Sequence, residues 1–134
     1  MELRRTSAGR RWVVGADIAA PADRVWELLV DTERWPEWGP TVAAVESPTR
    51  RIEAGTTGHV RIRGIGARVP FEIRCFDAEA MRWRWDVAGV PATGHRVAAS
   101  GDGCRVEFEI PFAAAGYAPV CRRACRKIKR LAEN

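Results

Sequence analysis

The sequence of 134 residues lacks any long apolar run and any secretory signal. No window holds the about 18 consecutive apolar residues that a membrane-spanning helix requires, so we expect no membrane insertion. The first twelve residues, MELRRTSAGRRW, are basic but contain no apolar h-region, which argues against a secretory signal and favours a cytoplasmic location. Hydrophobic residues make up 46% of the chain and charged residues 29%, as in soluble globular domains.

Residues suited to metal binding and to nucleophilic catalysis are also scarce. The sequence has 2 histidines, His59 and His95, and 4 cysteines. Cys121 and Cys125 have the i,i+4 spacing of two zinc ligands, but no second pair completes a known zinc motif. Without a secretory signal, disulfides are not expected. No Ser–His–Asp set and no phosphate-binding glycine loop is present. We therefore expect no metal, no cofactor and four small, buried cysteines.

Lysine is nearly absent, since only 2 of the 22 basic residues are lysines, and the net charge is +5. A basic surplus is typical of proteins that bind nucleic acids or anionic membranes. Most of the arginines, however, alternate with apolar residues, as in VRIRG (60–64) and MRWRW (81–85), which is typical of the solvent-facing side of strands. A nucleic-acid partner is therefore not favoured. Only the basic face of the C-terminal helix is compatible with one.

The order of the hydrophobic patterns predicts an α+β domain. Residues 12–18 alternate as in a strand, and from Pro21 onward apolar residues recur at helical spacing. This helix is expected to end near Arg34, because the next residue precedes a proline, and residues 36–38 then form a second short helix. Six further strands are expected, over residues 41–47, 57–64, 69–77, 81–88, 93–100 and 103–112.

The last segment, residues 115–134, has the clearest amphipathic helical pattern. The strands before it follow one another without helices between them, so the sheet should be antiparallel. A single sheet and one long helix bury their apolar faces when the sheet curls around the helix. The first ten residues are polar and are expected to form a mobile tail, 1–10, which leaves one domain over residues 11–134.

The stretch IAAPADRVWELLVDTERWPEWGP (18–40) resembles the N-terminal signature of START-like (SRPBCC) proteins, and it is most similar to their polyketide cyclase/dehydratase-like group. The matching positions are Ala20-Pro21, Val25-Trp26, Asp31, Trp35 and Trp38-Gly39-Pro40. The resemblance spans about residues 11–132. It implies a helix-grip fold, in which a curved antiparallel sheet of about seven strands wraps around a long C-terminal helix, with two short N-terminal helices and a cavity. The family binds hydrophobic small molecules such as lipids, polyketides and plant hormones, and some members are enzymes.

Alternation along the strands predicts which side chains face such a cavity. The inward positions include Cys75 and, at the end of the last strand, Phe112. The candidate ligand-binding residues are Trp38, Phe71, Ile73, Trp83, Trp85, Val97, Phe108, Tyr117 and Cys121. Glu72, Glu107 and Glu109 fall on the opposite, polar face, so the interior has no pair of carboxylates for acid–base chemistry.

His95 is the candidate catalytic residue. If Val97 and Ala99 face inward, so does His95, and burial would hold its imidazole neutral near pH 7. It could then serve as general acid or base toward a carbonyl-bearing ligand. A shift of one residue in register would turn it outward, where it would only bond backbone or water.

Two tryptophans lie in the proline- and glycine-rich stretch ERWPEWGP (33–40). Trp38 is expected at the cavity rim, whereas Trp35 is expected to anchor the first helix. Plain packing is the alternative for both, as it is for Trp83 and Trp85, because aromatic residues on regular elements are mostly core.

Three functions are compatible with these features, in order of preference. The first is binding of a hydrophobic, lipid- or polyketide-like small molecule between the sheet and the C-terminal helix. The second is a polyketide cyclase or dehydratase that uses His95. The third is an anionic-partner or nucleic-acid module that uses the basic helix. The sequence does not distinguish a monomer from a homodimer.

Overall fold

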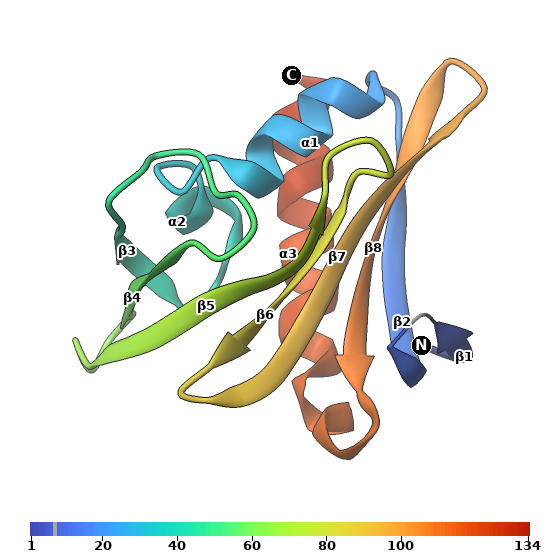
Figure 1. The fold of residues 1–134 in the computed structure, drawn as a ribbon. Coiled ribbons are helices and arrows are strands. Elements are labelled where there is room, and N and C mark those ends of the chain that lie inside the picture. Colours follow the sequence, from blue (N-terminus) through green and yellow to red (C-terminus); the bar gives the residue numbers. More distant parts are fainter. Residues whose placement is uncertain (7) are drawn as a thin grey trace.

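The structure is a computed structural model and describes residues 1–6 and 8–134. In this part of the chain, one antiparallel sheet with the strand order β1-β2-β8-β7-β6-β5-β4-β3 curves around the C-terminal helix (Figure 1). The strands are β1 (Glu2–Thr6), β2 (Gly9–Ile18), β3 (Val42–Glu46), β4 (Thr57–Ile62), β5 (Arg68–Asp77), β6 (Arg82–Val87), β7 (Val90–Ser100) and β8 (Gly103–Pro111). The helices are α1 (Ala22–Val30), α2 (Trp35–Trp38), the 3-10 helix η1 (Phe112–Tyr117) and α3 (Ala118–Glu133).

The apolar stripe of α3 explains why the sheet curves around this helix. Cys121, Cys125 and Ile128 are at most 2% exposed, and the helix packs against β2 and β8. Burial of a side chain of the size of Ile128 stabilises the fold by about 1.5–3 kcal/mol. The opposite face of α3, with Arg122 and Arg126, is exposed to solvent. No helix among the described residues is long and apolar enough to cross a membrane.

The N-terminus forms a strand, β1, where the sequence predicted a mobile tail over residues 1–10. β1 and β2 form a hairpin that turns at Gly9, whose φ of +98° suits a residue without a side chain. Arg4 reaches across β2 and donates two hydrogen bonds to Glu107 of β8, at 2.8 and 3.1 Å. The tail prediction failed because the strand is held by ladder hydrogen bonds and ion pairs, which a search for apolar alternation does not detect. Ser7 lies outside the described residues.

Glu107 lies on the outer face of the sheet, as predicted, yet it is only 7% exposed because arginines cover it. Arg4 lies on one side, and Arg105 donates a further hydrogen bond at 3.0 Å. Burial by itself raises the pKa of Glu107, but the two arginines outweigh it and hold the pKa below its usual value. The carboxylate is therefore charged and satisfied in the folded protein at neutral pH.

We expect Arg4→Met to lower the free energy of unfolding by about 1 kcal/mol at pH 7, since Arg4 is partly exposed and its ion pair is screened. The folded pKa of Glu107 is depressed, so its contribution is present above the unfolded value of about 4.3 and is lost as the pH falls through the folded pKa. Urea unfolding of variant and wild type at pH 7 and pH 3 should therefore give a smaller difference at pH 3. Arg5→Met, on the exposed side of β1, is the control, and an equal loss in both variants would contradict the role of Arg4.

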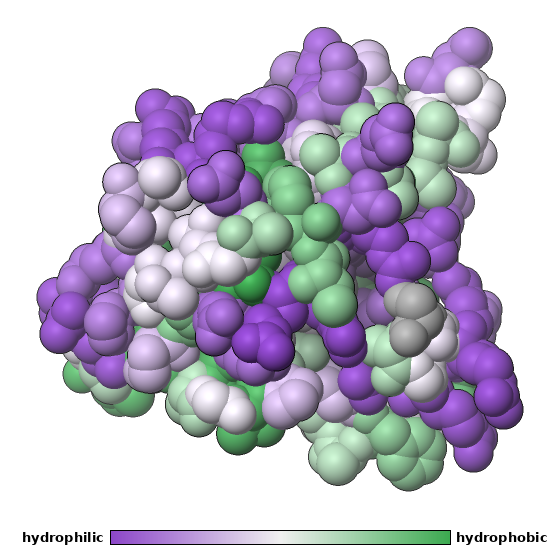
Figure 2. Space-filling model, in the orientation of Figure 1, coloured by the Kyte–Doolittle hydropathy of each residue, from purple (hydrophilic) through white to green (hydrophobic). Residues whose placement is uncertain are grey.

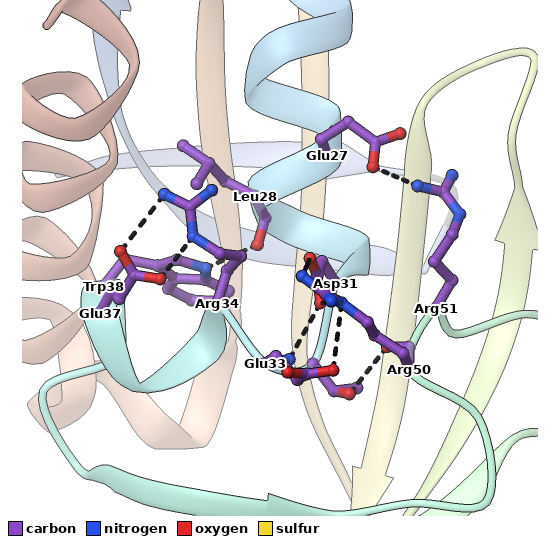
Figure 3. Close-up of polar contacts among 10 residues, drawn as sticks. Glu27, Leu28, Asp31, Glu33, Arg34, Glu37, Trp38, Arg50 and Arg51 are labelled. Carbon is purple, nitrogen blue, oxygen red and sulfur yellow. Dashed lines mark hydrogen bonds and ion pairs between the residues drawn. The ribbon is translucent and has the colours of Figure 1, made fainter.

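The first helix is shorter than predicted, because α1 ends at Val30 and not near Arg34. Asp31 leaves the helical conformation, with φ −89° and ψ 105°, and pairs with Arg51 in an isolated bridge. Its carboxylate accepts two hydrogen bonds from Arg50, at 2.9 and 2.8 Å, as Figure 3 shows. The Arg50 guanidinium holds the pKa of Asp31 below its usual value. This pairing with the loop before β4 stops the helix, which sequence periodicity could not indicate.

Two residues predicted to face inward lie outside the core. Cys75 is exposed, with φ +45°, at an irregularity in the pairing of β5 with β6, and Phe76 contacts Trp26 in the core instead. Phe112 is 55% exposed because β8 ends at Pro111, and its ring stacks on Trp12 with centroids 5.7 Å apart. A bulge and a strand end both interrupt the two-residue alternation on which the predictions depended.

Candidate ligand-binding site

A cavity of about 370 Å³ lies between the concave face of the sheet, α2 and the first turns of α3. Its wall is contributed by α2, strands β3 to β8, η1 and α3, so it lies where the sheet grips the helix. Most of the lining side chains are apolar, and they include Val60, Trp83, Trp85, Phe108, Ile110 and Ala124. In the described part of the chain, no lysine or arginine lines the cavity.

The cavity has an exposed mouth and a buried end. Tyr117, 42% exposed, and Pro91, also exposed, line the mouth beside η1 and the β6–β7 turn. His95, Trp83 and Phe108, at 2–3% exposed, line the buried end. Figure 2 shows apolar residues along the lower edge of the molecule, where η1 and this turn lie in Figure 1. A ligand that enters at this edge would therefore lose its contact with water toward His95.

The short helix α2 places two indoles on the cavity wall and ties them to α1. Nε1 of Trp35 donates to the Leu29 carbonyl at 2.9 Å, and Nε1 of Trp38 donates to the Leu28 carbonyl at 2.7 Å. These carbonyls belong to the last turn of α1, where carbonyl groups have no backbone N–H donor within the helix. Figure 3 shows Trp38 reaching Leu28 in this way. Pro36 lies in the first turn of α2, where it needs no amide partner.

The aromatic rings at the buried end form one contiguous cluster. Trp83 stacks on Trp35, with ring centroids 5.6 Å apart, and on His95, with centroids 4.0 Å apart. Phe108 meets the His95 ring edge to face at 4.6 Å. Trp85 meets Trp35 edge to face at 5.4 Å. Such pairs are worth about 0.5–1.5 kcal/mol each beyond their burial, so the rings are held in fixed orientations.

His95 faces the cavity, 3% exposed, in the register that pairs it with Trp83 on β6 and Phe108 on β8. Its Nε2 lies 3.1 Å from Oγ1 of Thr93, which also accepts a hydrogen bond from Nε1 of Trp85 at 3.1 Å. Burial lowers the pKa of His95 to about 3, and a contact with the Trp83 backbone opposes this only in part. The imidazole is therefore neutral throughout the physiological pH range.

The structure brings together most of the residues that the sequence selected. His95, Trp38, Trp83, Trp85, Phe108, Tyr117 and Cys121 all line the cavity. Phe71, Ile73 and Val97, in contrast, are buried in the surrounding core and do not line it. They face inward as predicted, and the Phe71 ring packs against Trp35 and Trp85.

Sequence reasoning missed several lining residues, which lie on β7, on α3 and in the loop after α2. Thr93 is the most important, because it is the polar residue that bonds both Trp85 and His95. Pro40, Pro91 and Val120 also line the cavity. Thr93 has the same parity as His95 along β7, and this signal could have identified it. The prolines gave no such signal, since proline is more often a turn residue than a binding residue.

Reactive groups other than His95 are few at this site. Burial raises the pKa of the Cys121 thiol to about 12, so it remains protonated and is a poor nucleophile. Among the described residues, no group of three or more His, Cys, Asp or Glu side chains is placed to hold a metal ion. The chemistry that the residues present can offer is apolar contact, aromatic stacking and a few hydrogen bonds.

A second hollow, of about 550 Å³, lies at the edge of the sheet and is lined by parts of β3, β4 and β5 with Asp86 and Gly89. It is a shallow surface groove, and Glu46 in its wall is already occupied by Arg61 and Arg68. The larger volume reflects open surface, so the enclosed cavity beside His95 is the better candidate site.

A curved antiparallel sheet that grips one long helix around an apolar cavity defines the helix-grip class of α+β proteins. Residues 11–133 match the family described as "Polyketide cyclase / dehydrase and lipid transport", and the chain belongs to this family. The match covers nearly the whole sequence and confirms the resemblance that the N-terminal motif indicated. A comparison with curated proteins found no match.

Solved structures share this fold at low sequence identity. The protein XoxI from Bacillus cereus has a TM-score of 0.70 and 12% identity over 91% of this chain and 94% of that chain. Ara h 8.0201 has a TM-score of 0.67 and 12% identity over 91% and 96%. The di-domain ARO/CYC StfQ from the steffimycin biosynthetic pathway has a TM-score of 0.68 and 18% identity, and covers 91% of this chain but 45% of its own. These similarities establish the fold.

Proposed function

We propose that this protein binds a hydrophobic small molecule, lipid- or polyketide-like, in the cavity between the sheet and α3. The observation that carries the proposal is the cavity itself, because an apolar space of about 370 Å³ is left open beside a tightly packed aromatic cluster. Protein interiors are normally packed to high density, so an open apolar space of this size has a cost in lost contacts. Binding an apolar ligand would recover those contacts.

The size and lining of the cavity fit this function. Small-molecule pockets have volumes of about 300–1,000 Å³ and are mostly apolar with a few polar groups. Here the polar side chains are Thr93 and His95 at the buried side, Tyr117 at the mouth, and Thr41, whose hydroxyl lies 3.3 Å from that of Tyr117. The family includes cyclases and lipid transport proteins by its description, which supports a ligand of this class.

Blocking the cavity tests the proposal. Val120 lines it from α3 and is partly buried, so Val120→Trp should fill the space and weaken binding of fluorene, a flat aromatic probe, and of dodecanol, a lipid-like probe, at least tenfold. Binding is measured from the fluorescence of the tryptophans that line the cavity. Ala99→Trp adds the same indole at an exposed site on β7 and should leave affinity unchanged. If neither probe binds the wild type, or if Val120→Trp binds both normally, the proposal is wrong.

Acid–base catalysis by His95 is the second candidate, favoured by its position on the cavity wall. A catalytic base works best with a pKa near the working pH, whereas burial lowers the pKa of His95 to about 3. This low pKa favours binding over turnover. Catalysis would require a substrate whose own groups raise that pKa, and turnover that survives His95→Ala would exclude this role.

A further inference from the structure

The four indoles that line the cavity differ in one respect, which is whether their N–H group has a partner. Trp35, Trp38 and Trp85 donate to Leu29, Leu28 and Thr93, respectively. Nε1 of Trp83 has no hydrogen-bond partner, although it is fully buried. A buried donor without a partner costs about 1–3 kcal/mol. Such a group in a folded protein calls for a specific explanation.

A second unpartnered polar atom belongs to the ring stacked on Trp83. Nδ1 of His95 is buried and has no hydrogen-bond partner of ordinary geometry, and the ring makes only a weaker contact with the Trp83 backbone. The two rings stack with centroids 4.0 Å apart, and both line the cavity. Among the described residues, these are the two buried side-chain nitrogen or oxygen atoms without a partner. Their occurrence on adjacent rings at the buried end indicates one shared cause.

The hydrogen bonds around Thr93 indicate which kind of atom is missing. The Thr93 hydroxyl accepts a hydrogen bond from Trp85, and we infer that it donates its own hydrogen to Nε2 of His95. A neutral imidazole that accepts at Nε2 carries its hydrogen on Nδ1. Both unpartnered atoms are then donors, and a single acceptor oxygen would suit them.

We propose that the buried end of the cavity binds a carbonyl oxygen of the ligand through Nε1 of Trp83 and Nδ1 of His95. This subsite rests on the proposed function and narrows its ligand class to apolar molecules that carry a ketone, ester or amide carbonyl. A carboxylate is less suited, because no lysine or arginine lines the cavity in the described part of the chain. A desolvated carboxylate would have no opposite charge to stabilise it.

A trapped water is the rival partner for the same two atoms. Trp83 and His95 also border a void of about 10 Å³ toward the outer face of the sheet, beside Arg84, Gly94 and Glu109. A buried water needs a void of at least about 10–15 Å³, so this void is at the lower limit for one water molecule. If water satisfied both donors, a ligand carbonyl would gain nothing at this end.

Fluorene and fluorenone separate these alternatives, because they have nearly the same shape and fluorenone adds a carbonyl oxygen. The preference for fluorenone is measured as the ratio of the fluorene Kd to the fluorenone Kd. This ratio should be about tenfold greater in the wild type than in Trp83→Phe, because a tenfold change corresponds to about 1.4 kcal/mol, the size of one hydrogen bond. Trp38→Phe is the matched control. Its indole N–H already donates to the Leu28 carbonyl and takes no part in the hydrogen bonds of Thr93, so both affinities should fall while their ratio stays as in the wild type.

A spectroscopic measurement on the wild type does not depend on how the variants fold. The indole N–H resonance of Trp83, assigned by its absence in Trp83→Phe, should move downfield on addition of fluorenone and much less with fluorene. Equal ratios in all three proteins, or an indole signal that responds equally to both ligands, would overturn the subsite and leave the proposed function standing. If neither ligand binds, the subsite is overturned, and dodecanol then decides the proposed function.

Discussion

Replacement of Trp35 by alanine is expected to lower the free energy of unfolding by about 3–5 kcal/mol, as large aromatic-to-alanine changes in protein cores do. Trp35 is 1% exposed and contacts the rings of Trp83 and Trp85. Its loss would also leave the Leu29 carbonyl at the end of α1 without its indole partner. A large cavity and an unsatisfied buried acceptor would therefore arise from one substitution.

Chemical denaturation of wild type and variant would measure this loss. Trp12→Ala is the matched control, because Trp12 is only partly buried and donates to the Phe112 carbonyl at 3.2 Å near the surface. We expect the control to cost about 1–2 kcal/mol. Equal losses at the two positions would contradict the view that Trp35 is the central member of the aromatic cluster.

The substitution Ile128→Asp should destabilise the protein still more, by at least about 4 kcal/mol at pH 7, so that a native fold of ordinary stability is largely lost. Ile128 is fully buried on the face of α3 that the sheet grips. A carboxylate there would have neither water nor an opposite charge. Burial would raise the folded pKa of the new carboxyl above its unfolded value, so the penalty should shrink as the pH falls toward that unfolded value.

Far-UV circular dichroism and thermal unfolding at pH 7 and pH 4 would follow this effect. Arg126→Asp changes the net charge more than Ile128→Asp does, but Arg126 is exposed on the opposite face of the same helix. It should alter stability by no more than about 0.5 kcal/mol. A cooperative transition near the wild-type temperature in Ile128→Asp at pH 7 would show that α3 is not the centre of the core.

Much of the fold could be predicted because its elements carry strong periodic patterns. The stripe of α3 and the alternation at the centre of β5, where Phe71 and Ile73 are buried, reflect burial on one face, which is the property that periodicity measures. The failures have local physical causes. β1 is held by its ladder with β2 and by Arg4, and α1 is stopped by the pairing of Asp31 with a distant loop. Neither contact leaves a signal in neighbouring residues.

The candidate site was predictable to the extent that it lies on regular elements. His95, Trp83 and Phe108 were found by alternation, and they occupy neighbouring strands at the buried end of the cavity. Which inward residue meets open space and which meets other side chains depends on three-dimensional packing. This is why Phe71 belongs to the core while Thr93, which is hydrogen-bonded to Trp85 and His95, belongs to the cavity wall.

The two roles of Trp35 and Trp38, in the cavity wall and at the end of α1, constrain how this protein can be adapted to new ligands. Each indole both lines the cavity and holds the end of α1, so a substitution that reshapes the cavity at either position also weakens the scaffold. Selection for altered specificity should therefore accumulate changes at Val120, Pro91 and Tyr117, which line the cavity, are not fully buried and carry less of the stability. Mutant libraries confined to these three positions should retain many more folded members than libraries that include the two tryptophans.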